Sequence, residues 1–364
     1  MEYRTLPRGG EKISVIGMGS GSIGAQPEEE IIRTVRTAVD NGINYFDMAG
    51  GHAPIFPGYG KALEGIRDKV YLQIHFGAEY TTGEYGWTTN LNRIKKSVQW
   101  QMENLRTNYI DFGFIHCLDE DNDLDTYIRN GVLDYILDLK RKGVIRHIGL
   151  SSHTPSVAQK VLDMGIIDVL MFSINPLYDY GQGDYAFGSN SERYDLYRRC
   201  EKEGVGIVVM KPFCGGQLLD ADQSPFGIAL NKYQCIRYAL DKPGVMCVVP
   251  GYSNEEELKD VLGYLNAPDE EKDYSVIAGY APKDNESSCV YCKHCHPCPV
   301  GLDIALINKY YDLWMLGDNL AKEHYLTLDK TAKDCIGCEH CDRRCPFHVR
   351  QSERMKIILK ELGE

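Results

Sequence analysis

Eight of the 13 cysteines stand in two runs near the C-terminal end of this 364-residue chain. The first run is Cys289-x2-Cys292-x2-Cys295-x2-Cys298-Pro299, and the second is Cys335-x2-Cys338-x2-Cys341-x3-Cys345-Pro346. Three thiolates at this spacing wrap one 4Fe–4S cubane, and in two-cluster proteins the fourth cysteine of each run ligates the other cluster. The crossing rule predicts two ligand sets: Cys289, Cys292, Cys295 and Cys345 for one cluster, and Cys335, Cys338, Cys341 and Cys298 for the other.

Two other uses of paired cysteines compete with this interpretation. Zinc ribbons also contain C-x-x-C pairs, but runs that each end in Cys-Pro fit two clusters better than two ions. Disulfides belong to secreted proteins, and Met1–Gly10 has no apolar core of signal-peptide length. No stretch approaches the ~20 apolar residues that span a membrane. We therefore predict a cytoplasmic protein that binds no membrane. The net charge of −12 argues against a nucleic-acid-binding surface.

Apolar, β-branched runs alternate with helical periodicity before the cysteines. The predicted strands are Ile13–Ile16, Ile43–Met48, Val70–Phe76, Tyr109–His116, Ile145–Ser151, Ile167–Asn175, Val205–Met210 and Val245–Val249. The predicted helices are Glu28–Asn41, Phe56–Gly65, Leu91–Leu105, Leu124–Lys140, Ser156–Leu162, Ser191–Glu203, Ile228–Leu240 and Glu255–Leu262. Ser253 with Glu256 predicts a capping box at the last of these.

Eight strand–helix units with short connections favour a closed (β/α)8 TIM barrel over an open doubly wound sheet. The open alternative is weakened because residues 17–22 lack the G-x-G-x-x-G spacing. We predict an α/β chain with a barrel over 1–268 and a small, mostly helical ferredoxin-like domain over 269–364. The stretch Ala267–Ser288 is the expected connection, and the expected helices are Ala305–Leu316, Asp318–Leu326 and Ser352–Leu362.

Barrel chemistry takes place at the carboxyl ends of the strands. That rule selects Asp47, His75, His116, Ser151–His153, Asn175 and Lys211–Pro212 as candidate site residues. Cys117 and Cys214 lie near predicted strand ends and are within reach of the same cavity. The three loops expected to choose a small-molecule substrate are Gly50–Gly58, Gly77–Asn90 and Asp179–Asn190, which are rich in Gly, Tyr and acids.

Six blocks in order carry a family resemblance. They are Gly42–Ala49, Tyr109–Asp111 with His116, Ile148–His153, Asn175–Tyr178, Met210–Pro212 with Gly215-Gly216, and Val249–Asn254. Nearly the whole chain resembles an aldo-keto reductase of the subgroup with a C-terminal ferredoxin-like domain. The resemblance implies a barrel that passes hydride between NAD(P)H and a carbonyl. It also implies an Asp–Tyr–Lys–His tetrad in which the tyrosine is the general acid.

Two of the four tetrad positions depart from the family. Asp47 and His116 stand where the family has its aspartate and histidine, whereas His52 replaces the tyrosine and His75 replaces the lysine. The resemblance implies that NAD(P), if bound, contacts Ser151, Ser152, Asn175, Lys211, Gly251, Ser253 and Asn254. This groove also departs from the family, because three glutamates follow Asn254 where a 2′-phosphate needs cations.

Three hypotheses follow from the altered tetrad. In the first, carbonyl reduction continues with an imidazolium as proton donor, since histidine titrates near neutrality. In the second, the carboxylate of Asp47 and the imidazoles of His52, His75 and His116 bind an additional metal such as zinc or ferrous iron. The clusters would then drive the reaction without nicotinamide. In the third, the barrel is a non-catalytic scaffold for electron transfer to a redox partner protein.

Overall fold

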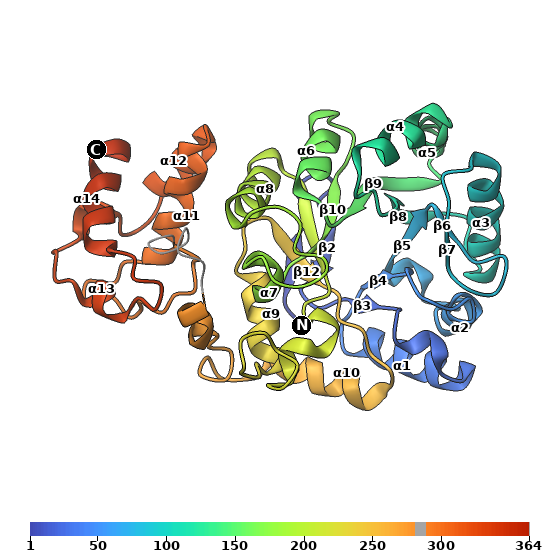
Figure 1. Ribbon diagram of the computed structural model, residues 1–364, viewed down its shortest axis with the longest axis horizontal. Helices are drawn as coiled ribbons and strands as arrows, with labels where there is room; N and C mark the ends of the chain where they lie inside the picture. The colour runs from blue at the N-terminus through green and yellow to red at the C-terminus, as the bar shows by residue number, and fades with distance from the viewer. Residues whose placement is uncertain (281–288, 364) are drawn as a thin grey trace.

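The computed structural model describes residues 1–280 and 289–363 (Figure 1). In this part of the chain, eight parallel strands form one continuous sheet. In sheet order they are β3 (Met18–Gly19), β4 (Tyr45–Asp47), β5 (Tyr71–Phe76), β8 (Ile110–Ile115), β9 (Ile145–Ser152), β10 (Val169–Ser173), β11 (Gly206–Met210) and β12 (Val245–Val248). Parallel bridges from Ile16 to Val248 and from Gly19 to Gly251 join the first strand to the last. The sheet therefore closes into the predicted (β/α)8 barrel.

Helices follow the strands along the chain and cover the barrel from outside (Figure 1). They are α1 (Glu28–Asp40), α2 (Ile55–Ala62), α3 (Leu91–Asn104), α4 (Asp121–Arg129), α5 (Val132–Arg141), α6 (Pro155–Asp163), α8 (Asn190–Glu203), α9 (Lys232–Leu240) and α10 (Glu255–Leu262). The single helix predicted over Leu124–Lys140 is wrong, because Gly131 adopts φ 74° and divides α4 from α5.

Two further local predictions are wrong. Ile13 does not start a barrel strand: Lys12–Ser14 (β2) pairs antiparallel with Tyr3–Thr5 (β1). This hairpin places Leu6 and Ile13 in the same apolar cluster as the barrel interior, where they fill its floor. At α10 the N-cap is Asn254 rather than Ser253, and its side chain accepts a hydrogen bond from the Glu257 backbone N–H at 2.9 Å.

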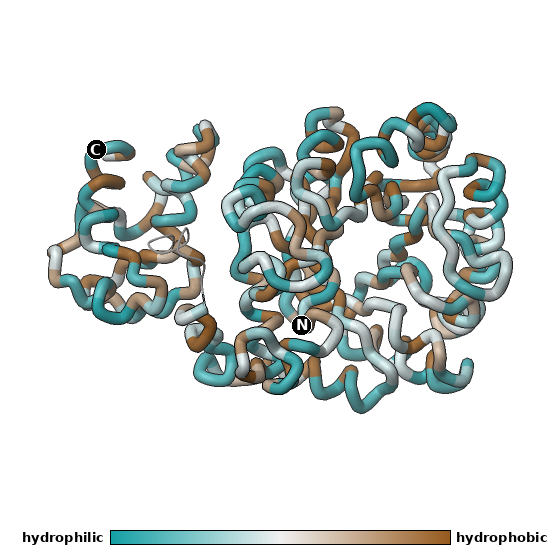
Figure 2. Tube along the Cα trace, viewed as in Figure 1, coloured by the Kyte–Doolittle hydropathy of each residue, from teal (hydrophilic) through white to brown (hydrophobic). Residues whose placement is uncertain are grey.

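The barrel interior is packed with side chains rather than hollow. Phe112, Phe114, Met171 and Val208 belong to this cluster, and the strands are brown over much of their length in Figure 2. The ring of Phe114 lies against Gly149 so closely that a Cβ there would approach ring carbons to about 2.4 Å. Position 149 of β9 therefore has to be glycine, because the ring of Phe114 on the adjacent strand β8 leaves no room for a side chain.

Two short elements in the mouth loops were not predicted. The chain between β5 and α3 folds back as a hairpin of β6 (Ala78–Glu79) and β7 (Gly86–Trp87). The chain between β10 and α8 contains a single-turn helix, α7 (Pro176–Asp179), capped by the side chain of Asn175. Elements this short carry too little periodicity to be detected in sequence.

The C-terminal domain consists mainly of α11 (Ile304–Met315), α12 (Asn319–Leu326), α13 (His340–Arg344) and α14 (Gln351–Leu362) (Figure 1). It contacts the barrel through α8 and α11. Lys309 pairs with Glu201 at 2.6 Å, and Lys202 donates to the Leu316 carbonyl at 2.6 Å. Part of the predicted connection, 281–288, lies outside the described residues. Within 1–280 and 289–363, no helix has the length and apolar character needed to cross a membrane.

A fully buried ion pair joins α7 to the two helices behind it. Asp179, the last residue of α7, accepts from Arg193 Nε of α8 at 2.8 Å, and both side chains are excluded from solvent. The same carboxylate accepts from the hydroxyls of Tyr197 at 2.6 Å and Tyr238 at 2.8 Å. The charge is thereby surrounded by donors, as a buried carboxylate requires.

We expect Arg193→Met to lower the free energy of unfolding by about 3 kcal/mol, because it leaves a buried carboxylate without its cation. Urea denaturation followed by circular dichroism measures this value. The control is Arg141→Met, whose partner Asp138 is at the surface and whose own side chain is 71% exposed; there the loss should stay below about 0.5 kcal/mol. Equal effects in the two variants would contradict the assigned importance of the buried pair.

Candidate functional site

A chain of hydrogen bonds runs inward from the barrel mouth at the carboxyl ends of neighbouring strands. Tyr85 Oη lies 2.8 Å from His116 Nε2, and His116 Nδ1 lies 2.9 Å from His75 Nδ1. His75 Nε2 lies 2.8 Å from Asp47 Oδ1. We call these four residues the relay. Its inner members are almost fully buried, whereas Tyr85 is 43% exposed.

Strand register explains why the inner members of the relay meet. Asp47 ends β4, His75 lies one residue before the end of β5, and His116 directly follows β8. Gln73 is opposite Asp47 in the β4–β5 register, two residues before His75, and therefore points into the barrel with it. Its amide nitrogen lies 3.1 Å from Asp47 Oδ1 and 2.8 Å from His75 Nε2.

Sequence reasoning missed Tyr85 and Gln73. Tyr85 lies in the turn between β6 and β7, within the loop 77–90 that was selected for its composition, but no motif marks one tyrosine among several. The strand period would have revealed Gln73, because a residue two positions before a site histidine shares its face.

The structure does not bring His52 into the relay. Its backbone bridges to Glu84 and its side chain is exposed, and among the described residues it forms no hydrogen bond or ion pair. Asp47, His75 and His116 converge as predicted, but the four-ligand metal set predicted with His52 is not assembled.

Burial sets the protonation of the outer relay. It lowers the pKa of His116 well below its usual value, and the neighbouring His75 lowers it further, so His116 is neutral near pH 7. Burial also raises the pKa of Tyr85 to about 12, with smaller contributions from Cys117 and Asp119. The phenol is therefore fully protonated at the same pH.

The residues predicted to hold a dinucleotide are engaged within the protein. Ser151 is buried beside Met171, and Ser152 Oγ donates to the Leu118 carbonyl at 2.7 Å. Both ends of the Asn175 amide are engaged, since it donates to the Lys211 carbonyl at 2.9 Å and accepts from the Tyr178 N–H at 3.0 Å.

The remaining groove positions lie where α10 begins. Gly251 bridges to Gly19, the Ser253 N–H donates to Glu257 at 2.8 Å, and Asn254 caps the helix. Three glutamates occupy the first turn of α10, where their negative charges offset the positive end of the helix dipole that would otherwise attract a phosphate. Lys211 belongs to a separate cluster, with Nζ 2.8 Å from His153 Nε2. These residues do not fit an anionic dinucleotide.

The eight cysteines of the two runs surround two separate pockets, as the crossing rule predicts. One pocket is lined by Cys289, Cys292, Cys295 and Cys345, and the other by Cys298, Cys335, Cys338 and Cys341. None of these eight cysteines forms a disulfide within the described residues. Four converging thiols per pocket are the donor set that a 4Fe–4S cluster takes, so the residues present fit the group.

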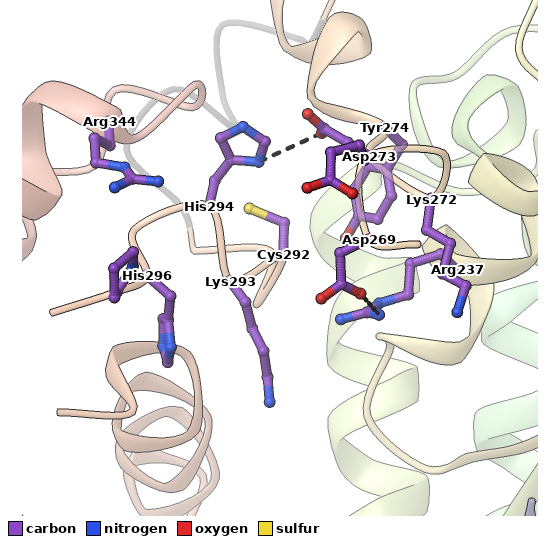
Figure 3. Close-up of a pocket in the computed structure, with 12 residues that line it drawn as sticks. Arg237, Asp269, Lys272, Asp273, Tyr274, Cys292, Lys293, His294, His296 and Arg344 are labelled. Atoms are coloured by element: carbon purple, nitrogen blue, oxygen red, sulfur yellow. Dashed lines mark ion pairs between the residues drawn. The ribbon is translucent and has the colours of Figure 1, made fainter. Parts of the chain in front are cut away.

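A cleft of about 580 Å³ opens between the barrel and the cysteine domain (Figure 3). Cys292 lines both this cleft and the first cysteine pocket. His294 Nδ1 reaches across it to within 3.4 Å of Asp273, and on the barrel side Arg237 pairs with Asp269 at 3.6 Å (Figure 3). The first pocket is therefore the one that this cleft approaches.

Comparison with known proteins now identifies both parts of the chain. Residues 15–229 match the description "Aldo/keto reductase family", and residues 287–350 match "4Fe-4S dicluster domain". The chain belongs to the aldo/keto reductase family. It is therefore an oxidoreductase that carries a dicluster domain after its barrel.

Individual relatives are distant. The L-galactose dehydrogenase of Arabidopsis thaliana is 27% identical over 236 residues, which cover 60% of this chain and 68% of the relative. Aldo-keto reductase AKR11C1 from Bacillus halodurans superposes with TM-score 0.61 at 23% identity, over 75% of this chain and 94% of that one. An aldo/keto reductase from Klebsiella pneumoniae, solved in complex with NADP and acetate, gives TM-score 0.56 at 18% identity, over 78% and 97%. These structural likenesses show the shared fold.

We expect about eight iron atoms per chain after anaerobic reconstitution, from two cubanes. The variant Cys298→Ala/Cys341→Ala removes two ligands of one predicted cluster and should retain about four iron. Cys298→Ala/Cys345→Ala removes one ligand from each cluster and should retain almost none. Iron and sulfide analysis measures both, with the core variant Cys235→Ala as the control that keeps about eight. Almost no iron in both double variants would mean that each run holds its own cluster, because each variant then removes one ligand from each cluster.

Proposed function

We propose that this protein reduces a small conjugated carbonyl compound at the barrel mouth, with protons supplied through the relay and electrons by the dicluster domain. The observation that supports this most directly is the continuous chain of hydrogen bonds from the phenol of Tyr85 to the buried carboxylate of Asp47. The family uses a tyrosine as general acid, and Tyr85 would restore that group from a different loop.

Proton accounting gives the relay two states. With Asp47 ionised and both imidazoles neutral, each bond has one donor when His75 Nε2 donates to Asp47, His116 Nδ1 donates to His75, and the phenol donates to His116. With one more proton, stored on Asp47, every bond reverses and the phenol points outward. Passing from the second state to the first delivers one proton to a substrate oxygen, and a proton taken up from water at the mouth restores the second state.

Gln73 suits both states of the relay. Its amide N–H can donate to Asp47 Oδ1 in both states, because a carboxyl oxygen keeps a free lone pair whether it is ionised or protonated. A donor that serves both states lowers the cost of reversing the chain, since neither state leaves a buried acceptor without a partner.

The cysteine pockets and the predicted dinucleotide groove together favour the 4Fe–4S clusters over a nicotinamide as the source of electrons. When bound, 4Fe–4S clusters supply electrons singly, and two of them hold the two electrons that a carbonyl needs. Cys289, Cys292, Cys295 and Cys345 would hold one cluster, and the other four cysteines of the runs would hold the second. The family's nicotinamide is not used here, because the groove residues are engaged and α10 begins with three glutamates.

Single-electron delivery restricts the substrate. The half-reduced form must be stabilised by conjugation, as in quinone-type or α-dicarbonyl compounds, whereas an isolated ketone offers no such stabilisation. Two electrons and two protons complete the reduction, one proton from Tyr85 and one from water at the open mouth. Aromatic rings at the mouth suit a flat acceptor: Tyr185 lies 6.2 Å from Tyr178 and contributes to the raised pKa of Tyr85.

Tyr85→Phe should lower turnover about 10²- to 10³-fold, because it removes the proton donor while leaving the buried relay intact. Oxidation of reduced methyl viologen by cluster-loaded protein measures the rate, with diacetyl as conjugated substrate and acetone as the unconjugated comparison. The matched control is Tyr135→Phe on α5, away from the mouth, which should keep full activity. Full activity in Tyr85→Phe, or turnover with NADPH alone, would refute the proposal.

The rate should fall as the pH rises, because the proton-delivering state of the relay holds one more proton than the other state. The outer groups do not cause this fall, since the phenol is lost only as the pH rises through about 12 and His116 gains a proton only below its usual range. A pH–rate profile under saturating substrate tests this, and a rate that stays constant between about pH 7 and pH 11 would contradict the two-state relay.

A further inference from the structure

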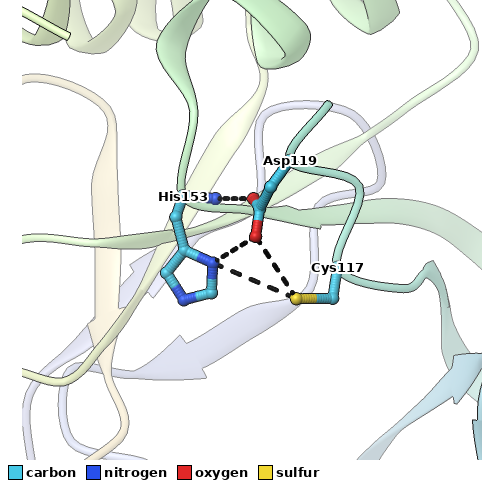
Figure 4. Close-up of side chains that lie close together, drawn as sticks. All are labelled: Cys117, Asp119 and His153. Carbon is cyan, nitrogen blue, oxygen red and sulfur yellow. Dashed lines mark hydrogen bonds and ion pairs between the residues drawn. The ribbon is translucent and has the colours of Figure 1, made fainter. Parts of the chain in front are cut away.

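A second cluster of polar side chains lies at the mouth, beside the relay but outside it. Cys117 and Asp119 follow β8, and His153 follows β9 (Figure 4). Their ligand atoms are close: Cys117 Sγ to Asp119 Oδ2 is 3.5 Å, Asp119 Oδ2 to His153 Nδ1 is 2.9 Å, and Cys117 Sγ to His153 Nδ1 is 4.0 Å. One sulfur, one nitrogen and one oxygen thus face a common point.

These distances match the edges of a metal coordination tetrahedron. With bonds of about 2.3 Å to sulfur and about 2.0 Å to nitrogen and oxygen, tetrahedral ligands lie about 3.3 to 3.6 Å apart. The three observed edges differ from these by about half an ångström or less, which small side-chain rotations provide. Three protein ligands leave a fourth position open toward the mouth, as in catalytic sites.

Further contacts hold Cys117, Asp119 and His153, which we call the trio, in place. Asp119 Oδ1 accepts from the His153 backbone N–H at 2.6 Å, which turns Oδ2 toward the other two ligands. Lys211 Nζ lies 2.8 Å from His153 Nε2 and fixes the ring plane. Metal-ligating histidines are oriented by such contacts at the second nitrogen.

Backbone conformation adds a separate observation. Cys117 and Lys211 are non-glycine residues with φ of 49° and 55°, a region that costs energy for L residues. Both point their side chains to the same place from different strands. Such conformations persist at sites where the placement of a side chain matters more than local strain.

A nucleophilic role for the thiol fits the site less well. Reactive cysteines have a depressed pKa beside cations or helix N-termini. Here the charged group beside the sulfur is a carboxylate, Asp119 Oδ2 at 3.5 Å, which does not favour a reactive thiolate. The imidazole is 4.0 Å from the sulfur and already bonded to Asp119, so it is not placed to act as its base.

We propose that Cys117, Asp119 and His153 form a binding site for one divalent cation of intermediate softness, such as Zn2+ or Fe2+, with an open position at the barrel mouth. Thiolate, imidazole and carboxylate together select such an ion over Mg2+ or Ca2+, which prefer oxygen alone. The site stands apart from both cysteine pockets and from the relay, and it does not rest on the proposed function.

Zn2+ titration of the cluster-loaded protein tests the proposal. Calorimetry should give one ion per chain, and absorption at the zinc edge should show one sulfur at about 2.3 Å with nitrogen or oxygen at about 2.0 Å. Iron in the clusters absorbs at a different edge and leaves this signal readable. His153→Gln and Asp119→Asn should each weaken binding at least 10-fold, and Cys117→Ser should remove the sulfur from the zinc spectrum.

Controls separate this site from other thiols. Cys214→Ser removes a neighbouring buried cysteine outside the trio and should leave affinity and spectrum unchanged. Iron content and circular dichroism verify that each variant is folded and loaded. No saturable binding below about 100 μM would overturn the proposal. It would also be overturned by a sulfur signal that persists in Cys117→Ser, since that signal would come from another cysteine.

Discussion

The buried carboxylate of Asp179 is the interaction on which the arrangement of the two functional regions depends. It ties the single turn α7 to Arg193 of α8 and Tyr238 of α9. On its mouth side, α7 places Tyr178 beside the loop that carries Tyr185. On the other side, α8 holds the cysteine domain through Glu201. Because a buried charge must keep all its donors, this junction resists independent movement of barrel and cysteine domain.

Under the proposed function, a catalytic constellation is rebuilt from new positions at the mouth. The family resemblance places His52 and His75 where the family has its tyrosine and lysine, which suggested a loss of the phenol. In the structure, His75 lies between Asp47 and His116, and the hairpin β6–β7 brings Tyr85 to His116. A general acid is defined by the atom it presents, so a loop can supply it as well as a strand end can.

The sequence predicted those features that depend on period and spacing. Eight apolar runs and the helices between them specified the barrel, and cysteine spacing alone grouped Cys345 with the first run and Cys298 with the second. It failed where the outcome depends on which loop residues meet in space. Nothing local marks Tyr85, and Cys117, Asp119 and His153 come together only because β8 and β9 are adjacent in the closed sheet. The first strand was misplaced because the apolar side chain of Ile13 packs into the barrel floor from the β1–β2 hairpin and does not belong to a strand of the barrel sheet.

Charge links the junction to the first cysteine pocket. Lys242 follows α9 and is buried, with no hydrogen-bond partner for its Nζ among the described residues. Its ammonium lies 3.4 Å from the ring centre of Tyr238, the tyrosine that donates to Asp179. Burial lowers the pKa of Lys242 to about 8, while Asp179, Asp241 and the thiols Cys292 and Cys289 favour its charged form. Negative charge in that pocket would therefore favour the charged form of Lys242, which contacts Tyr238 and so the hydrogen bonds that hold Asp179 of α7. The first cysteine pocket and the helix α7 at the mouth thus share one set of buried charges.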